Sequence, residues 1–174
     1  KRNAQLFNSG RGEVVDSSAL KTALKTGRIA GAVLDVWENE PGIDRELLNR
    51  VRIGTPHIAG YSTDGKANGT AMSVRAIANF FGIAELRNWH PARLPEPEQP
   101  VVVLDPEDSA VRQIARALLH TYEIGFDDRN LRNDPAGFET QRGRYRVRRE
   151  FPAFTVRNAS PEARAILEKL GFNF

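Results

Sequence analysis

The sequence contains no cysteine among its 174 residues. Disulfide bonds and thiolate metal sites are therefore excluded, no metal site is predicted, and the composition suits a reducing cytoplasm. No apolar run approaches the roughly 20 residues of a membrane-spanning helix, and no secretory signal sequence opens the chain. With 40% hydrophobic and 27% charged residues, the sequence predicts a soluble globular protein of the cytoplasm, built as one domain or two small ones.

A strongly basic domain is also lacking, although the formal net charge is +3. Residues 1–90 hold 12 Lys and Arg against 9 Asp and Glu, and residues 91–174 hold 13 of each sign. A nucleic-acid partner is therefore not expected. The run QRGRYRVRRE at 141–150 is rich in arginine, and nearby acids favour salt bridges within the domain or across an interface over a nucleic-acid patch. Whether this run ends a helix or forms an edge strand stays open.

Short apolar runs alternate with helical patterns over the first third of the chain. The runs are at 5–8, 29–36 and 51–53, and the helices are expected at about 17–26 and 45–48. Asp16 and Asp44 are the predicted N-caps, and Gly27 follows the first helix. The order strand, helix, strand, helix, strand predicts an α/β fold with a parallel sheet, and the unbroken run at 29–36 suits a strand covered on both faces.

Arg11, Glu40 and His57 each lie in the loop that follows one of these runs. Ligands bind beyond the carboxyl ends of parallel strands, so the three side chains are expected to converge. A histidine can move a proton near neutral pH, a carboxylate can orient its ring, and an arginine can clamp a substrate carboxylate. The set suits proton transfer at a hydroxyl group next to a carboxylate. Taken singly, each of the three is also a common type of loop residue.

Asp35, at the end of the second run, is the most informative single residue. An acid in that place accepts a hydrogen bond from a cofactor hydroxyl or from a backbone amide.

The segments NSGRGEVVD, VLDVWENEP and GTPHIAGY resemble the C-terminal half of the coenzyme domain of the NAD-dependent D-2-hydroxyacid dehydrogenases. The resemblance covers residues 6–61 and implies a Rossmann-like NAD-binding fold. It implies that Arg11 binds the substrate carboxylate, that His57 is the catalytic acid and base, and that Glu40 pairs with His57.

The same resemblance implies that Asp35 contacts the nicotinamide side of NAD, and that Gly60 and Tyr61 bind cofactor and substrate respectively. Parts of the tail, at 115–131, 145–151 and 169–172, are similar to a branch of the family that oxidises a phosphorylated 2-hydroxy acid. In that branch the C-terminal domain forms a homodimer. A branch acting on another phosphorylated acid, with the tail binding an effector, and a non-catalytic dimerisation module are the alternatives.

The family's glycine-rich loop, G-x-G-x-x-G, occurs nowhere in the 174 residues. That loop brings backbone amides to the cofactor pyrophosphate. The expectation is therefore that the chain is the C-terminal part of a longer enzyme and that, alone, it neither binds NAD tightly nor turns over substrate.

Four segments are predicted along the chain. Residues 1–61 form the C-terminal half of the NAD-binding domain, and 62–90 a helix that leads back toward a substrate domain outside the given sequence. Residues 91–100, with four prolines, form a stiff linker. Residues 101–174 form a small α+β dimerisation domain, with strands expected at 101–105 and 151–156 and helices at 107–122 and 161–170.

Overall fold

A computed structural model describes residues 3–174, and the chain divides into two compact units. The first unit combines the residues up to Ala59 with Ile124–Tyr145. The second unit combines Gly60–Glu123 with Arg146–Phe174. The segment 124–145 was expected within the tail domain, and the structure groups it with the predicted NAD-binding region instead.

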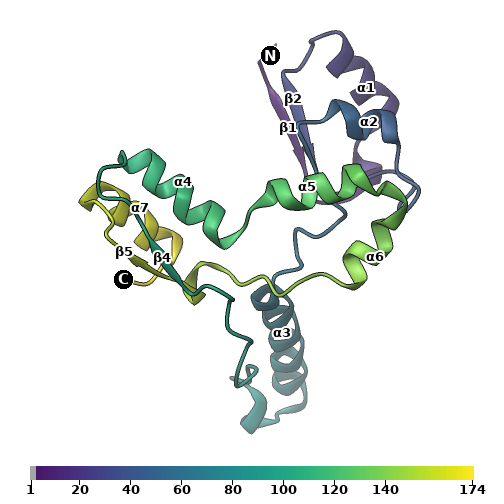
Figure 1. Cartoon of the computed structure of the whole chain (residues 1–174). Coiled ribbons are helices and arrows are strands. Elements are labelled where there is room, and N and C mark those ends of the chain that lie inside the picture. Colours follow the sequence, from purple (N-terminus) through teal and green to yellow (C-terminus); the bar gives the residue numbers. More distant parts are fainter. Residues whose placement is uncertain (1–2) are drawn as a thin grey trace. The chain divides into compact units, whose positions relative to one another are not determined.

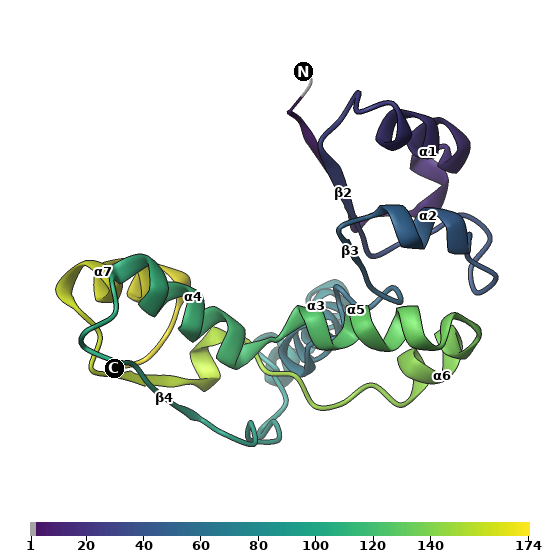
Figure 2. The same ribbon diagram turned by 45° about the horizontal axis from the view of Figure 1, so that its top comes forward.

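The first unit contains a three-stranded parallel sheet in the order β1-β2-β3. Its strands are β1 (Gln5–Asn8), β2 (Gly31–Leu34) and β3 (Ile53–Gly54). Helices α1 (Ser17–Lys25) and α2 (Arg45–Arg50) connect them and lie on the same side of the sheet, while a short 3-10 turn, η1 (Gly12–Val14), follows β1 (Figures 1 and 2). The predicted α/β fold with a parallel sheet is confirmed.

Side-chain caps begin α1 and α2 as the sequence predicts. Asp16 Oδ1 accepts from the backbone N–H of Ala19 at 2.8 Å, and Asp44 Oδ1 accepts from that of Leu47 at 3.0 Å. Gly27 follows α1 with φ at +66°, a backbone conformation that favours glycine. A hydrogen bond from the Lys21 ammonium lowers the pKa of Asp44 below its usual value, so this cap stays charged at neutral pH.

The two faces of the sheet differ in how well they are covered. The face turned toward α1 and α2 presents residues such as Ala32 and Leu34, which are buried in one core cluster with Trp37 and Leu47. On the opposite face Phe7 is 74% exposed. The expectation that the run at 29–36 is covered on both faces is therefore met on one face only within residues 3–174.

A helical hairpin completes the first unit. It consists of α5 (Ile124–Asn133), the 3-10 turn η3 (Pro135–Gly137) and α6 (Phe138–Gly143), and α6 folds back on α5 in both views (Figures 1 and 2). Leu131 and Phe138 are fully buried in the same core cluster as the strands. Asp128 accepts from the Gly54 N–H of β3 at 2.7 Å. Apolar burial and hydrogen bonds thus attach the hairpin to the sheet.

The second unit contains two parallel strands, β4 (Val101–Val103) and β5 (Thr155–Arg157). Helices α4 (Ala110–Thr121) and α7 (Pro161–Leu170) pack with them around one apolar cluster. The predicted strand at 151–156 is wrong at its start. Phe151–Ala153 forms a 3-10 turn, η4, because Pro152 cannot donate to a strand ladder.

Helix α3 (Thr63–Phe81) also belongs to the second unit and ends at Gly82, which has φ at +70°, so it is shorter than the helix expected over 62–90. A short turn, η2 (Ala84–Leu86), follows. The start of α3 is tied to the residues before β5, because Asp64 pairs with Arg149 at 2.9 Å. Burial acts to raise the pKa of Asp64, yet hydrogen bonds from Arg149 and from the Glu150 N–H hold it below its usual value. None of the described helices, α3 included, is long and apolar enough to cross a bilayer.

Arg132 of α5 provides a test of how the hairpin is held. Its guanidinium donates to the Leu48 carbonyl at 2.6 Å and the Val51 carbonyl at 3.1 Å, and it pairs with Asp128 at 2.9 Å. We expect Arg132→Met to lower the free energy of unfolding by about 2 kcal/mol, because buried carbonyls lose a charged donor. Urea denaturation measures the change. Arg28→Met, at an exposed arginine of the same unit, is the control, and equal loss in both variants would contradict the prediction.

Candidate active site

The carboxylate of Asp35 organises the loop that carries His57. Asp35 follows β2 and is only 6% exposed. Its Oδ1 accepts from the Thr55 hydroxyl at 2.7 Å and from the Ile58 N–H at 2.8 Å, and its Oδ2 accepts from the Ala59 N–H at 2.9 Å. The Asp35 carbonyl accepts from the His57 N–H at 2.7 Å. One buried acid therefore satisfies donors on both sides of the histidine.

His57 and Glu40 form a close pair. The Nδ1 atom of His57 lies 2.7 Å from Oε2 of Glu40, with side-chain exposures of 27% and 20%. The other oxygen of Glu40 accepts from the Trp37 N–H at 2.8 Å, which fixes the carboxylate. A neutral ring that donates Nδ1–H to Glu40 has its lone pair on Nε2. The pair is thus arranged to accept or return a proton at Nε2.

The backbone around the pair is held in uncommon conformations. His57 has φ at +56° and Asn39 has φ at +60°, both in the left-handed region. Non-glycine residues stay there only when their surroundings enforce it. For His57 the enforcing contacts are its N–H bond to Asp35 and its side-chain bond to Glu40.

The loop that carries Arg11 lies against the loop that carries Glu40. A Cβ atom on Gly12 would collide with the carbonyl group of Trp37, so the chains approach there as closely as only glycine permits. The side chain of Arg11 is exposed and donates to the Gly10 carbonyl at 2.8 Å. Within residues 3–174, hydrogen bonds link Asp35 and Glu40 to the loop that carries His57. In the same range no hydrogen bond links Arg11 to Glu40 or His57.

Gly60 and Tyr61 follow the His57 loop in sequence and belong to the second unit. A Cβ atom on Gly60 would meet no atom within 4 Å, so its own packing does not require glycine. The Lys66 ammonium lies 4.0 Å from the centroid of the Tyr61 ring. Their assigned roles toward cofactor and substrate stay predictions.

Two supporting residues were not found from the sequence. Trp37 donates its indole N–H to the Thr55 carbonyl at 3.0 Å and so links the Glu40 loop to the His57 loop. Arg142 of α6 donates from Nε to the His57 carbonyl at 3.4 Å. The apolar run before Glu40 could have pointed to Trp37, whereas 85 residues separate Arg142 from His57 and no local pattern connects them.

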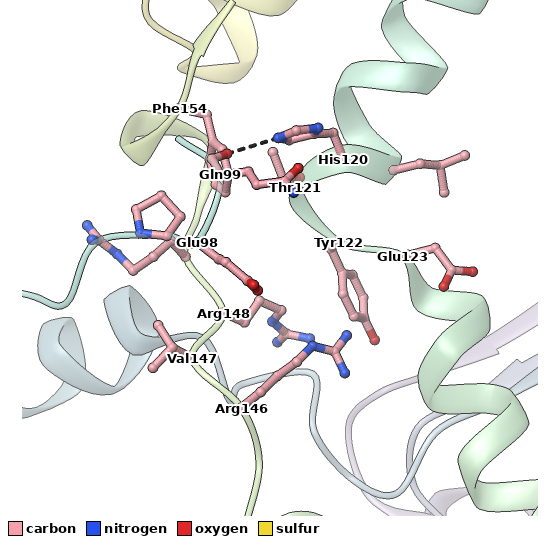
Figure 3. A pocket seen from close by; sticks show the side chains of 13 residues that line it. Glu98, Gln99, His120, Thr121, Tyr122, Glu123, Arg146, Val147, Arg148 and Phe154 are labelled. Atoms are coloured by element: carbon pink, nitrogen blue, oxygen red, sulfur yellow. Dashed lines mark hydrogen bonds between the residues drawn. The ribbon is translucent and has the colours of Figure 1, made fainter. Parts of the chain in front are cut away.

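The arginine-rich run at 141–150 is divided between the units. Arg142 pairs with Glu139 at 2.9 Å, so the prediction of salt bridges within the tail domain is confirmed for this arginine. Arg149 pairs at 2.9 Å with Asp64, which lies outside the predicted tail domain. Figure 3 shows Arg148 at a cavity of about 320 Å³ in the second unit, where its guanidinium lies 4.4 Å from the centroid of the Tyr122 ring. Residues 144–150 form neither a regular helix nor a strand.

Two family models match the chain. Residues 1–59 match the model described as D-isomer specific 2-hydroxyacid dehydrogenase, NAD binding domain. Residues 94–171 match a domain of unknown function, DUF3410. Together with the parallel sheet and the His57–Glu40 pair, the first match makes this part of the chain similar to the NAD-binding domain of the D-2-hydroxyacid dehydrogenases.

Curated relatives narrow the similarity to one branch. Over 96% of its length the chain is 44% identical to the erythronate-4-phosphate dehydrogenase of Porphyromonas gingivalis, of which it covers 44%. Over 99% of its length it is 39% identical to that of Saccharophagus degradans, of which it covers 46%. The chain thus spans less than half the length of these relatives. The resemblance found in the sequence is confirmed.

A solved structure is similar to part of the chain. It is an NADPH-dependent glyoxylate/hydroxypyruvate reductase from Sinorhizobium meliloti in complex with citrate, with 41% sequence identity and a TM-score of 0.39. The match covers 45% of this chain and 26% of that one.

Asp35→Asn tests whether the buried carboxylate holds the His57 loop. The side chain of asparagine has one acceptor oxygen, whereas the carboxylate of aspartate has two. In the variant, one backbone N–H of the loop therefore faces the NH2 group of the asparagine, which is itself a donor. We expect a loss of about 1–3 kcal/mol in unfolding free energy. We also expect faster amide hydrogen exchange at Ile58 and Ala59, measured by NMR. Asp16→Asn is the matched control, because asparagine caps a helix as well as aspartate. Unchanged exchange at both amides would exclude the positioning role.

Proposed function

We propose that this chain is part of an enzyme that oxidises 4-phosphoerythronate, a phosphorylated 2-hydroxy acid, to its 2-oxo acid with NAD. The resemblance assigns that reaction to pyridoxal 5'-phosphate (vitamin B6) biosynthesis in the cytoplasm. The observation that carries the proposal is the His57–Glu40 pair at 2.7 Å, built on the buried Asp35, in a segment that matches an NAD-binding domain. The names of the curated relatives support the choice of substrate.

The residues present fit a bound nicotinamide cofactor. The Asp35 carboxylate uses three of its roughly four acceptor positions on the loop, which leaves one for the cofactor. Gly60 has open space where a side chain would stand. In this proposal Asp35 and Gly60 contact NAD, which supplies the acceptor for the substrate hydride.

His57 removes the proton from the substrate hydroxyl in this mechanism. Its Nε2 accepts that proton, and the resulting imidazolium is stabilised by the Glu40 carboxylate at Nδ1. Arg11 swings from the Gly10 carbonyl to the substrate carboxylate, which its planar guanidinium can hold with two hydrogen bonds. Tyr61 contacts the substrate. The carboxylate and the hydroxyl are thereby fixed relative to Nε2.

His57→Ala tests the assignment in the complete enzyme. We expect kcat to fall at least about 100-fold, because the reaction loses its general base. The rate of NADH formation with 4-phosphoerythronate measures the effect. His90→Ala is the matched control, since His90 is exposed and contacts only Asn68 and Pro91 among the hydrogen bonds recorded for it. Near-normal turnover by His57→Ala would refute the role of the histidine.

We also propose that the tail forms a homodimer. The second unit exposes large apolar side chains on its strands and helices, as a surface covered by a second copy would. They include Val103, Val111, Leu119, Ile166 and Leu170. Val111 is 76% and Val103 66% exposed. Leaving these apolar side chains in water is unfavourable for a monomer, so the exposure favours a surface that a second copy covers.

Light scattering on the chain tests the dimer. We expect a mass of roughly two copies of 19.4 kDa at tens of micromolar. Val103→Glu combined with Val111→Glu is expected to give monomers, because each charge would be buried without a partner. Lys169→Glu, also in this unit, is the control for a change of charge. A monomeric wild-type chain with a folded spectrum would contradict the dimer.

A further inference from the structure

We infer that Arg142, supplied by the tail, binds the phosphate group of the substrate beside His57. This inference rests on the proposed function and extends it to the residue that recognises the phosphate. Its basis is a guanidinium from α6 placed at the backbone of the catalytic histidine, 85 residues away in sequence.

The hairpin that carries Arg142 is firmly attached to the strand that leads to His57. Asp128 accepts from the Gly54 N–H, and Arg132 donates to the Leu48 and Val51 carbonyls. The buried Phe138 begins α6, one turn before Arg142. These contacts fix where α6 begins relative to the end of β3, three residues before His57.

The end of α6 is also fixed to α5. Gln141, next to Arg142, donates to the Asn130 carbonyl of α5 at 3.4 Å and to the carbonyl of Asp134, just after α5, at 2.8 Å. The guanidinium of Arg142 lies 5.8 Å from the centroid of the Phe138 ring. These contacts anchor the segment that carries Arg142, while the Arg142 side chain stays partly accessible at 21% exposure. A preorganised cation of this kind loses little entropy when it binds an anion.

The chemistry at Arg142 suits a phosphate. Arginine is always charged and presents planar donors that match two phosphate oxygens. Its partners include the His57 carbonyl and Glu139, whose side chain is 60% exposed. A surface ion pair of that kind contributes about 0–1 kcal/mol, so a phosphate with up to two charges can displace Glu139.

The family matches place this cation outside the general dehydrogenase machinery. The NAD-binding model ends at residue 59, whereas Arg142 lies within 94–171, which the second model matches. An enzyme whose substrate carries a phosphate as well as a carboxylate needs a second cationic group besides Arg11. The tail supplies one at the loop of the catalytic histidine.

A comparison of two substrates in the complete enzyme tests the inference. We expect Arg142→Gln to lower kcat/KM for the phosphorylated acid by about 10- to 100-fold, the range for losing a hydrogen bond to a charged group. The value for the same acid without its phosphate is expected to change less than about 3-fold, within the range of a surface substitution. Arg142→Lys should restore part of the loss, because it keeps the charge without the planar fork.

Arg144→Gln, at an exposed arginine two residues further on, is the matched control and should leave both values unchanged. An equal fall for both acids in Arg142→Gln would show a structural role for Arg142 and overturn the inference. No fall for either acid would also overturn it.

A second readout separates this inference from the proposed function. Inorganic phosphate is titrated into the chain while the amides of residues 57–59 and 138–144 are followed by NMR. We expect saturable shifts in the wild type and in Arg144→Gln, and none in Arg142→Gln. This result would stand even if His57→Ala kept its turnover and the dehydrogenase assignment failed. Absence of shifts in the wild type would overturn the phosphate site whatever the enzyme assay shows.

Discussion

The candidate site depends on one buried carboxylate. Asp35 accepts from the Thr55 hydroxyl and from two backbone amides that follow His57. A carboxylate this deeply buried is stable only when its oxygens are hydrogen-bonded. Its donors belong to the loop around His57, so the same hydrogen bonds also shape that loop. The bonds to the carboxylate thus offset the cost of burying its charge and shape the loop on both sides of His57. The bonds of His57 to the Asp35 carbonyl and to Glu40 hold its left-handed conformation, and Glu40 also orients the ring.

The hairpin of α5 and α6 relates the tail to that site. Its sequence lies in the segment matched by the domain of unknown function, yet its apolar residues complete the core of the parallel sheet. Leu131 and Phe138 would be exposed without the strands, and the Gly54 N–H would lose Asp128. The tail therefore contributes to the structure around His57, whatever its role in assembly.

Local features of the structure could be predicted from the sequence, and contacts across long separations could not. The caps at Asp16 and Asp44 were predicted because a cap bonds within three residues of itself. The Glu40–His57 pair was predicted because parallel strands end at one edge of the sheet. Helix α5 was not predicted, because DDRNLRNDP is polar and the burial of this helix depends on strands more than 70 residues earlier, and the end of α6 within the run at 141–150 was left open.

The interleaved order of the two units bears on how the chain is made. The strands of the first unit leave the ribosome early, but its core includes Leu131 and Phe138, and its last segment ends at Tyr145. At a synthesis rate of about 5–20 residues per second, several seconds pass between the synthesis of the strands and that of those residues. During this time part of the apolar surface of the sheet is uncovered. The exposed Phe7 on β1 adds to that surface. The apolar core of the first unit is therefore complete only after the hairpin has emerged, although its strands are made first.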